Sequence, residues 1–229
     1  LARDQAQGRQ VLRAGGAEQA RLVALMQLTL PGLPVVYYGD ELGMPNTEIK
    51  YEEVRDLSVF SSGDMSVGRD PERTPMQWND GEYAGFSEVK PWLPVGQTLA
   101  EHNVMSQHSE PDSFLALYSR LLKLRRQYRI LRSGEYEPYG ELDIDLFMYA
   151  RWLGDQHIFV VLNFGKKDRV ATLPHGGRVL CSTHPVDYPM IEGDTVKVRP
   201  FEGVLIECKV HPISLDDENH SEDTVRTER

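Results

Sequence analysis

The spacing of apolar residues divides the chain into a helical part, a long irregular part and a part made of short strands. Residues 17–30 consist of strong helix formers with apolar residues around most of the circumference, which predicts a buried helix. Pro31 and Gly32 end this helix. Residues 35–38, VVYY, are continuously β-branched or aromatic, as in a parallel strand buried on both faces. Helix, turn and strand together predict an α/β unit.

The stretch from residue 43 to 111 sustains neither a helical nor a strand period, although proline, glycine and aromatic residues recur in it. A connection of this length is either functional or disordered, and its aromatic residues favour an ordered, functional segment. A regular pattern returns at Asp112, which we expect to cap a helix. From Phe114 to Leu124 the apolar residues follow the i, i+3, i+4, i+7 rule of that helix.

Beyond Ser133 and Gly134 the pattern changes to short strands separated by turns that contain glycine, aspartate and proline. The strands are expected at residues 142–152, 157–164, 169–173, 177–182, 194–198 and 203–210. In the first of them, apolar residues from Leu142 to Met148 alternate with aspartates, which predicts one buried and one solvated face. These strands predict a small antiparallel β-sandwich.

The fold class expected from these elements is α/β plus all-β. An α/β unit, a long loop leaving its strand and an appended sandwich indicate the C-terminal end of a (β/α)8 TIM barrel followed by a β-sandwich domain. We expect the barrel part over residues 1–132, the sandwich over residues 133–212 and a disordered acidic tail over residues 213–229. Sites of such barrels lie at the carboxyl ends of the strands, which here means the loop after residue 38.

The composition is that of an ordinary globular chain, with 40% hydrophobic and 26% charged residues. The net charge is −10 and no run of lysine or arginine offsets it, so we expect neither nucleic acid nor an anionic membrane as a partner. The longest apolar stretch, residues 22–38, is interrupted by polar residues and prolines, which argues against a membrane span.

The cysteines and histidines show no ligand spacing. Cys181 and Cys208 each lie in a short apolar run, so we interpret them as buried thiols, compatible with a cytoplasmic protein. His102 and His108 occur in the irregular stretch without the spacing of a ligand pair. No metal and no cofactor is therefore predicted.

Residues 68–78, GRDPERTPMQW, concentrate the candidate chemistry. An arginine offers a rigid fork of donors for sugar hydroxyls and a carboxylate, and a tryptophan offers an apolar face for a sugar ring. The prolines restrict the backbone that carries these side chains. Asp40 and Glu41 form a second candidate pair, but adjacent strand residues point to opposite faces, so we interpret them as turn-stabilising.

Three stretches of the chain resemble one known family: LPGLPVVYYGDELGM (30–44), GRDPERTPMQWNDGEYAGFS (68–87) and FVVLNFG (159–165). They are similar to the last barrel strand, the loop after it and the carboxyl-terminal domain of the α-amylase superfamily, glycoside hydrolase family thirteen. The loop containing PMQW resembles in particular the oligo-1,6-glucosidase, α-glucosidase and trehalose-synthase branches. The resemblance covers residues 17–210.

This resemblance implies retaining hydrolysis by an aspartate nucleophile, a glutamate acid/base and a further aspartate that stabilises the transition state. None of their motifs is found in residues 1–229, so no catalytic residue is assigned in this chain. The chain does not begin with Met, and we expect it to be an inert piece of a longer protein whose missing amino-terminal barrel segment is its partner. Without a closed barrel, Leu22, Leu25, Val35 and Val36 are expected to be exposed.

For the binding site, the resemblance implies that Arg69 contacts the glucose of the innermost donor subsite, with a partner aspartate from the missing segment. Arg73, Gln77 and Trp78 are further substrate-binding candidates, with the alternative that they brace the loop. The implied substrate is an oligosaccharide with α-1,4- or α-1,6-glucosidic bonds. A trehalose-synthase-like glucosyl transfer and a non-catalytic, amylase-like binding or receptor module are the alternative functions.

Overall fold

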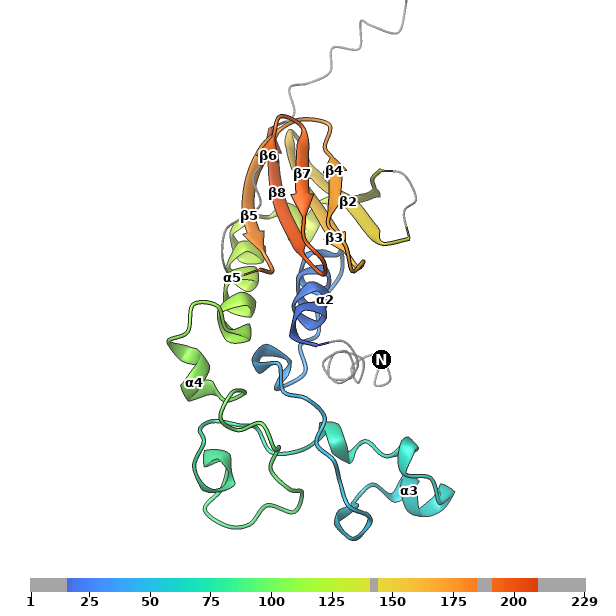
Figure 1. Ribbon diagram of the computed structural model, residues 1–229, viewed down its shortest axis with the longest axis vertical. Coiled ribbons are helices and arrows are strands. Elements are labelled where there is room, and N and C mark those ends of the chain that lie inside the picture. Colours follow the sequence, from blue (N-terminus) through green and yellow to red (C-terminus); the bar gives the residue numbers. More distant parts are fainter. Residues whose placement is uncertain (1–15, 141–143, 185–190, 210–229) are drawn as a thin grey trace, which may run out of the picture.

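The computed structural model describes residues 16–140, 144–184 and 191–209. They form an elongated molecule with two β-sheets at one end, helices α2 (Ala17–Thr29) and α5 (Phe114–Gln127) in the middle, and an irregular stretch at the other end (Figure 1). We call residues 33–111 the long segment, and the helices and sheets together the body. The predictions for the first 15 residues and for the acidic tail lie outside the described residues.

Both predicted helices are confirmed, and the short helix α6 (Ile130–Ser133) follows the second. The cap of α5 is Ser113 and not, as predicted, Asp112. The Ser113 hydroxyl oxygen accepts a hydrogen bond of 3.1 Å from the N–H of Ala116. A capping residue lies directly before the first helical residue, and this helix begins at Phe114, one residue beyond the reach of Asp112.

The strand predicted for residues 35–38 is wrong for this structure. These residues form neither strand nor helix, and Val35 is 43% exposed. A strand requires a hydrogen-bonded neighbour, and within the described residues none of the sheets contains this stretch.

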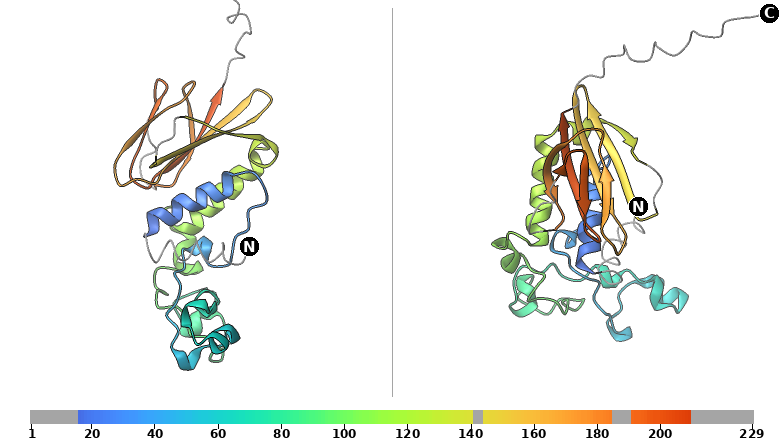
Figure 2. Two further views of the ribbon diagram at one scale, coloured as in Figure 1. Left: turned by 90° about the vertical axis from the view of Figure 1, so that its right-hand side faces the viewer. Right: turned by 45° about the horizontal axis from the view of Figure 1, so that its top comes forward.

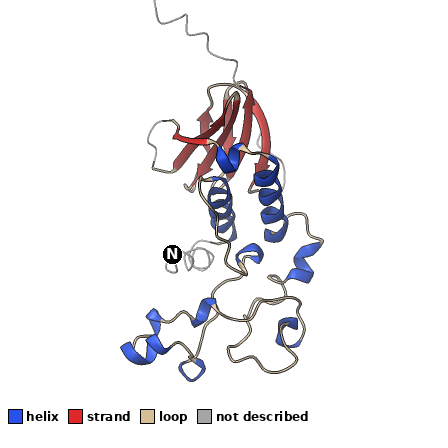
Figure 3. Ribbon diagram, turned by 180° about the vertical axis from the view of Figure 1, so that it is seen from behind, coloured by secondary structure: helices blue, strands red, loops and turns tan. Residues whose placement is uncertain are grey.

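The strands lie in two antiparallel sheets. The larger sheet has the order β1-β2-β3-β8-β5 and the smaller one β4-β7-β6. The strands are β1 (Glu135–Pro138), β2 (Leu146–Leu153), β3 (Gln156–Asn163), β4 (Arg169–Thr172), β5 (Gly177–Ser182), β6 (Ile191–Glu192), β7 (Thr195–Val198) and β8 (Gly203–Lys209). All pairs are antiparallel, as predicted, and all strands lie at one end of the molecule (Figure 3). The sequence pattern missed β1, which is exposed throughout, and the two-residue strand β6.

The predicted alternation at the start of the first long strand is only partly correct. Strand β2 begins at Leu146, four residues later than predicted, and Ile144 before it is 98% exposed. Met148, within the strand, is buried as expected. Tyr149, on the opposite face of the strand, is buried as well, because one face of β2 packs on the smaller sheet and the other on the helices, so the predicted solvated face is absent.

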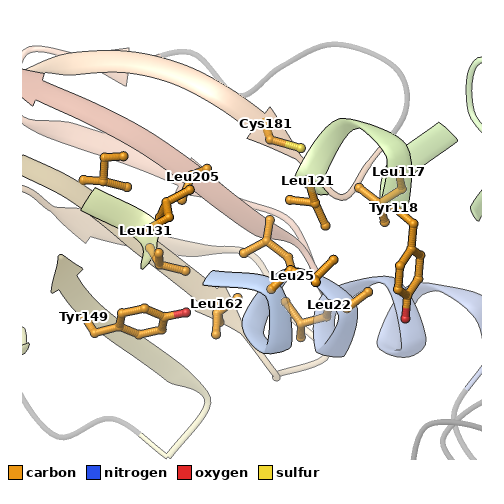
Figure 4. Packing of buried hydrophobic residues seen from close by; sticks show 14 of the residues in the cluster. Leu22, Leu25, Leu117, Tyr118, Leu121, Leu131, Tyr149, Leu162, Cys181 and Leu205 are labelled. Atoms are coloured by element: carbon orange, nitrogen blue, oxygen red, sulfur yellow. The ribbon is translucent and has the colours of Figure 1, made fainter. Parts of the chain in front are cut away.

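Two hydrophobic cores hold the body together. One lies between the two sheets, and the other lies between the larger sheet and the helices α2 and α5, which run side by side in Figure 2. Buried residues of the second core include Leu22, Leu25, Leu117, Tyr118, Leu121, Leu131, Tyr149, Leu162, Cys181 and Leu205 (Figure 4). The predicted exposure of Leu22 and Leu25 is thus wrong, because the sheet covers them, and only Val35 and Val36 are exposed.

Helix α2 approaches the larger sheet closely. A Cβ atom on Gly203 would lie 2.8 Å from Cδ1 of Leu22, so any other residue at the start of β8 would force Leu22 to shift. Cys181 and Cys208 are free, buried thiols, as predicted, and burial raises the pKa of the Cys208 thiol to about 11.

Two buried arginines fix the point where the chain leaves α2 for the long segment. Nη1 of Arg125 donates to the carbonyl oxygen of Leu28 at 2.9 Å, and Nη1 of Arg151 donates to that of Thr29 at 2.7 Å. Helix α2 has no basic residue in its last turn, so these guanidinium groups satisfy its terminal carbonyls and complement its dipole.

The long segment contains only short helices. They are the 3₁₀ helices η1 (Asp40–Leu42), η2 (Tyr51–Glu53), η3 (Met65–Val67), η4 (Asp70–Glu72) and η5 (Glu82–Gly85), and the α-helices α3 (Leu57–Ser62) and α4 (Val104–His108). None of the helices in the described ranges is long and apolar enough to cross a membrane.

Candidate functional site

Two Arg-Asp dipeptides, residues 55–56 and 69–70, bind each other at the base of a lobe that contains α3 (Figure 1). Oδ2 of Asp56 accepts hydrogen bonds from the backbone N–H of Arg69 at 3.1 Å and from its Nε at 2.9 Å. In return, Oδ2 of Asp70 accepts from the backbone N–H groups of Arg55 at 2.6 Å and of Asp56 at 2.8 Å. We call this reciprocal arrangement the Arg-Asp clamp.

The carboxylate of Asp56 is held from both sides. Its Oδ1 accepts hydrogen bonds from the backbone N–H of Ser58 at 3.1 Å and from the Ser58 hydroxyl at 2.6 Å. Hydrogen bonds from Arg69 and then from Ser58 hold the pKa of the Asp56 carboxyl well below its usual range, although burial opposes them. Asp56 is therefore a buried, ionised carboxylate at neutral pH.

Arg69 combines a fixed stem with an accessible end. Its Nε is bound to Asp56, yet its side chain is 50% exposed, and within the described residues its Nη groups make no hydrogen bond to the protein. Nη1 of Arg73 lies 4.0 Å from the same Oδ2 of Asp56. The fork of Arg69 thus presents donors beyond the ion pair, which is what recognition of a hydroxylated ligand requires.

Within this chain, Arg69 has a carboxylate partner that was not predicted. The resemblance implies a partner aspartate upstream of the chain, which stays a prediction, and the structure adds Asp56, 13 residues away from Arg69. Sequence reasoning missed Asp56. The Arg-Asp dipeptide is repeated at 55–56 and 69–70, but it also occurs at 3–4, so repetition alone does not single out this pair.

Gln77 has the contacts of a brace. It is 1% exposed, its Nε2 donates to the carbonyl oxygen of His102 at 2.5 Å, and its own carbonyl accepts from the N–H of Val104 at 3.0 Å. These bonds join the PMQW stretch to the start of α4.

Trp78 is half exposed, so part of its indole ring is accessible to a ligand. Its backbone N–H donates to the carbonyl of Ala84 at 2.9 Å, which closes a turn where Tyr83 and Ala84 adopt left-handed φ angles of 51° and 59°. Residues other than glycine rarely adopt this backbone conformation, so the turn carries backbone strain next to the exposed tryptophan.

Asp40 and Glu41 stabilise the turn before η1, as predicted. Oδ2 of Asp40 accepts from the N–H of Tyr37 at 3.0 Å, and Oε2 of Glu41 accepts from the N–H of Gly39 at 2.8 Å.

A pocket of about 540 Å³ lies between α2 and the stretch before α5. Its lining residues are Arg21, Ala100, Glu101, His102, Ser106, Gln107, Glu110, Asp112, Ser113 and Phe114. It contains none of the four predicted binding residues.

Among the described residues, no group of three or more His, Cys, Asp or Glu side chains could hold a metal ion.

The family model described as the alpha amylase catalytic domain matches residues 4–134, more than half of the chain. The chain belongs to the alpha-amylase family. The match includes the whole long segment with the Arg-Asp clamp and ends one residue before β1.

Individual members of the alpha-amylase family are similar over most of this chain. An oligo-1,6-glucosidase from Parageobacillus thermoglucosidasius is 31% identical over 216 residues, covering 84% of this chain and 38% of that protein. Maltase 1 from Drosophila virilis is 34% identical over 201 residues, covering 81% of this chain and 31% of that protein. The chain therefore spans about a third of the length of these relatives.

Solved structures of the family are similar too. The isomaltulose synthase from Protaminobacter rubrum has a TM-score of 0.75 at 25% identity, covering 86% of this chain and 40% of that chain. The trehalulose synthase from Pseudomonas mesoacidophila MX-45 has a TM-score of 0.75 at 27% identity, covering 83% of this chain and 38% of that chain.

Proposed function

We propose that this chain is the carboxyl-terminal part of an α-glucosidase of the oligo-1,6-glucosidase type. Residues 1–132 would complete a (β/α)8 barrel, and residues 133–212 would form the β-sandwich domain that follows it. The similarity to oligo-1,6-glucosidases over 84% of this chain but 38% of the relative supports this division. The nucleophile, the acid/base and the third carboxylate of retaining hydrolysis would come from the upstream part of the protein.

The exposed stretch before η1 supports an upstream partner. Val35 and Val36 are 43% and 36% exposed although their sequence is that of a strand buried on both faces. Neighbouring parallel strands of a barrel would cover them. In that arrangement the long segment leaves the carboxyl end of the strand, where the sites of such barrels lie.

The geometry of Arg69 is the main observation in favour of an oligosaccharide substrate. Its stem is bound to the buried Asp56 while its terminal donors remain accessible, which suits a neutral, hydroxyl-rich ligand such as the glucose unit of an oligosaccharide. The half-exposed Trp78 offers an apolar face for a sugar ring. Arg73 and Gln77 complete the proposed binding region, and the contacts of Gln77 fit the bracing role better.

The proposal is tested with the protein that contains this chain and its upstream sequence. Glucose release from isomaltose and maltose is measured, and the wild-type protein should turn over at least one of them. Arg69→Ala should lower kcat/KM by about 2–4 kcal/mol, or about 30- to 1,000-fold, as loss of a charged hydrogen bond in a water-excluded site does.

Arg73→Ala is the matched control because Arg73 faces the same carboxylate at 4.0 Å. It should cost less in kcat/KM and more in Tm. If Arg73→Ala abolishes activity at unchanged Tm while Arg69→Ala resembles the wild type, the assignment of the two arginines is reversed. Absence of turnover on every glucoside would contradict the proposal and favour a non-catalytic binding module.

Isomerisation of sucrose is a second candidate, favoured by the similarity to the isomaltulose and trehalulose synthases. The same protein incubated with sucrose would then yield an isomeric disaccharide, whereas a hydrolase yields equal amounts of glucose and fructose. Product analysis by chromatography separates the two.

A further inference from the structure

We infer that Asp56 is a positioning residue for Arg69: it orients the guanidinium so that its terminal donors face the sugar. This inference rests on the proposed function. It concerns a residue with no contact to the substrate of its own, which would act only through the arginine that it holds.

The distribution of hydrogen bonds on the Asp56 carboxylate carries the inference. One oxygen, Oδ1, receives both bonds from Ser58, and the other, Oδ2, receives both bonds from Arg69. Rotation of the carboxylate would break both sets at once. Because Oδ2 binds the backbone and the side chain of Arg69 together, it fixes the position of the residue and the direction of its side chain.

Asp70 completes this support from the opposite side. It is 4% exposed, and it fixes the backbone N–H of Asp56, so the carboxylate that orients Arg69 is itself held by the residue next to Arg69. A catalytic or binding group is effective only when the groups behind it fix its geometry.

A second turn in the same lobe shows that positioning an arginine is a role distinct from forming an Asp-x-Ser turn. Asp64 accepts hydrogen bonds from the N–H and the hydroxyl of Ser66, both at 2.8 Å, in the same Asp-x-Ser pattern as Asp56 and Ser58. Asp64 is exposed and forms no ion pair among the described residues. The turn therefore needs no arginine, and the buried charge at residue 56 is explained by its bonds to Arg69.

The test compares Asp56→Asn with Asp64→Asn in the protein that contains this chain and its upstream sequence. Both changes remove one negative charge from an Asp-x-Ser turn, but only Asp56→Asn removes the charge that pairs with Arg69. We expect Asp56→Asn to lower kcat/KM on an α-glucoside by about 10- to 100-fold, mainly through kcat, because misplacement of a binding group by about 1 Å has costs of this order. Asp64→Asn should stay within about twofold of the wild type.

A double-mutant cycle decides whether Asp56 acts through Arg69. In an Arg69→Ala background, Asp56→Asn should cause no further loss of kcat/KM, because the residue through which it acts is gone. An additive loss, or equal values for Asp56→Asn and Asp64→Asn, overturns the inference. If Asp56→Asn does not fold, Ser58→Ala replaces it: it removes the hydroxyl bond to Oδ1, keeps the backbone N–H bond, and leaves Arg69 untouched. It should show a smaller loss that again disappears in the Arg69→Ala background.

A measurement that needs no activity separates this inference from the proposed function. The ¹H–¹⁵N signal of the Arg69 Nε group should be protected from solvent exchange in the wild type and in Asp64→Asn, and unprotected in Asp56→Asn or, less completely, in Ser58→Ala. If the protein hydrolyses no glucoside but this pattern appears, the proposed function fails and the positioning of Arg69 by Asp56 stands. If protection persists in Asp56→Asn, the positioning role is overturned whatever the activity.

Discussion

The body and the long segment of this chain are ordered by different means. In the body, leucines from α2 and α5 meet valines and leucines of the larger sheet and are completely or almost completely buried. In the long segment, many large apolar side chains remain in solvent, among them Leu33, Tyr51, Leu57, Phe60, Trp78, Phe86 and Trp92. Its only apolar cluster in the described part of the chain consists of Ile49, Val54 and Val59.

Polar side chains bonded to the backbone take the place of a core in the long segment. Asp56, Asp70 and Gln77 each have an exposed fraction of 6% or less, and each binds backbone groups far away in the sequence. Hydrogen bonds are directional, whereas apolar contacts are not. A segment ordered in this way can hold a particular side chain such as Arg69 in one direction while most of its surface stays hydrated.

The largest loss of stability that tests this comparison is expected from a substitution in the body. Leu25→Ala should reduce the free energy of unfolding of the 229-residue chain by about 2–5 kcal/mol, since it leaves a cavity between α2 and the sheet. Leu33→Ala, at a position that is 90% exposed, is the control and should stay within about 0.5 kcal/mol. Urea unfolding measures both. Equal losses would mean that α2 does not pack on the sheet as described.

A smaller and local effect is expected from Gln77→Leu. This change keeps an apolar stem of similar size but leaves the carbonyl of His102 without its donor, at a cost of about 1–3 kcal/mol. Hydrogen exchange of the Val104 and Met105 amides, which bind the carbonyls of residues 77 and 78, should accelerate. The amide of Val160 in the centre of the larger sheet should not change; if it does, the long segment and the body unfold as one unit.

The smallest expected effect is a pH dependence of the stability that the Asp56 carboxylate adds. Because the pKa of Asp56 is lowered in the folded chain, its ionised form adds stability above the ordinary aspartate pKa of about 3.9 and loses it as the pH falls below that value. Between pH 6 and pH 3 the protection factors of the Ser58 and Arg69 amides, which both bind Asp56, should fall by roughly fivefold, or about 1 kcal/mol. In Asp56→Asn this dependence should be absent, and its persistence there would show that another group is responsible.

The body was largely predictable from the sequence because its pattern is local. Propensity and spacing identified α2 and α5, and β5 was predicted at its observed bounds of residues 177–182. The strand expected at residues 35–38 failed because a strand depends on a neighbour, which periodicity does not reveal. That a sheet of this same chain buries Leu22 and Leu25 was missed for the same reason, since this sheet lies more than a hundred residues further along the chain.

For the candidate site, the sequence offered residues but not their contacts. The residue types of GRDPERTPMQW indicated sugar recognition at Arg69 and Trp78, and both side chains are accessible. Asp56 was missed because an aperiodic stretch gives no register between residue 56 and residue 69. Only the folded backbone brings the two Arg-Asp dipeptides together.

The Arg-Asp clamp also has a consequence for the evolution of chain length. It ties residues 55–56 to residues 69–70, so the lobe of residues 57–68 begins and ends at one fixed point. Lengthening a loop whose ends are already joined has only a small entropic cost, which grows with the logarithm of its length. Insertions among the exposed residues 60–67, beyond Ser58 and the buried Val59, can therefore accumulate without displacing Arg69, and this tip is a natural place to graft a foreign peptide or a second binding module.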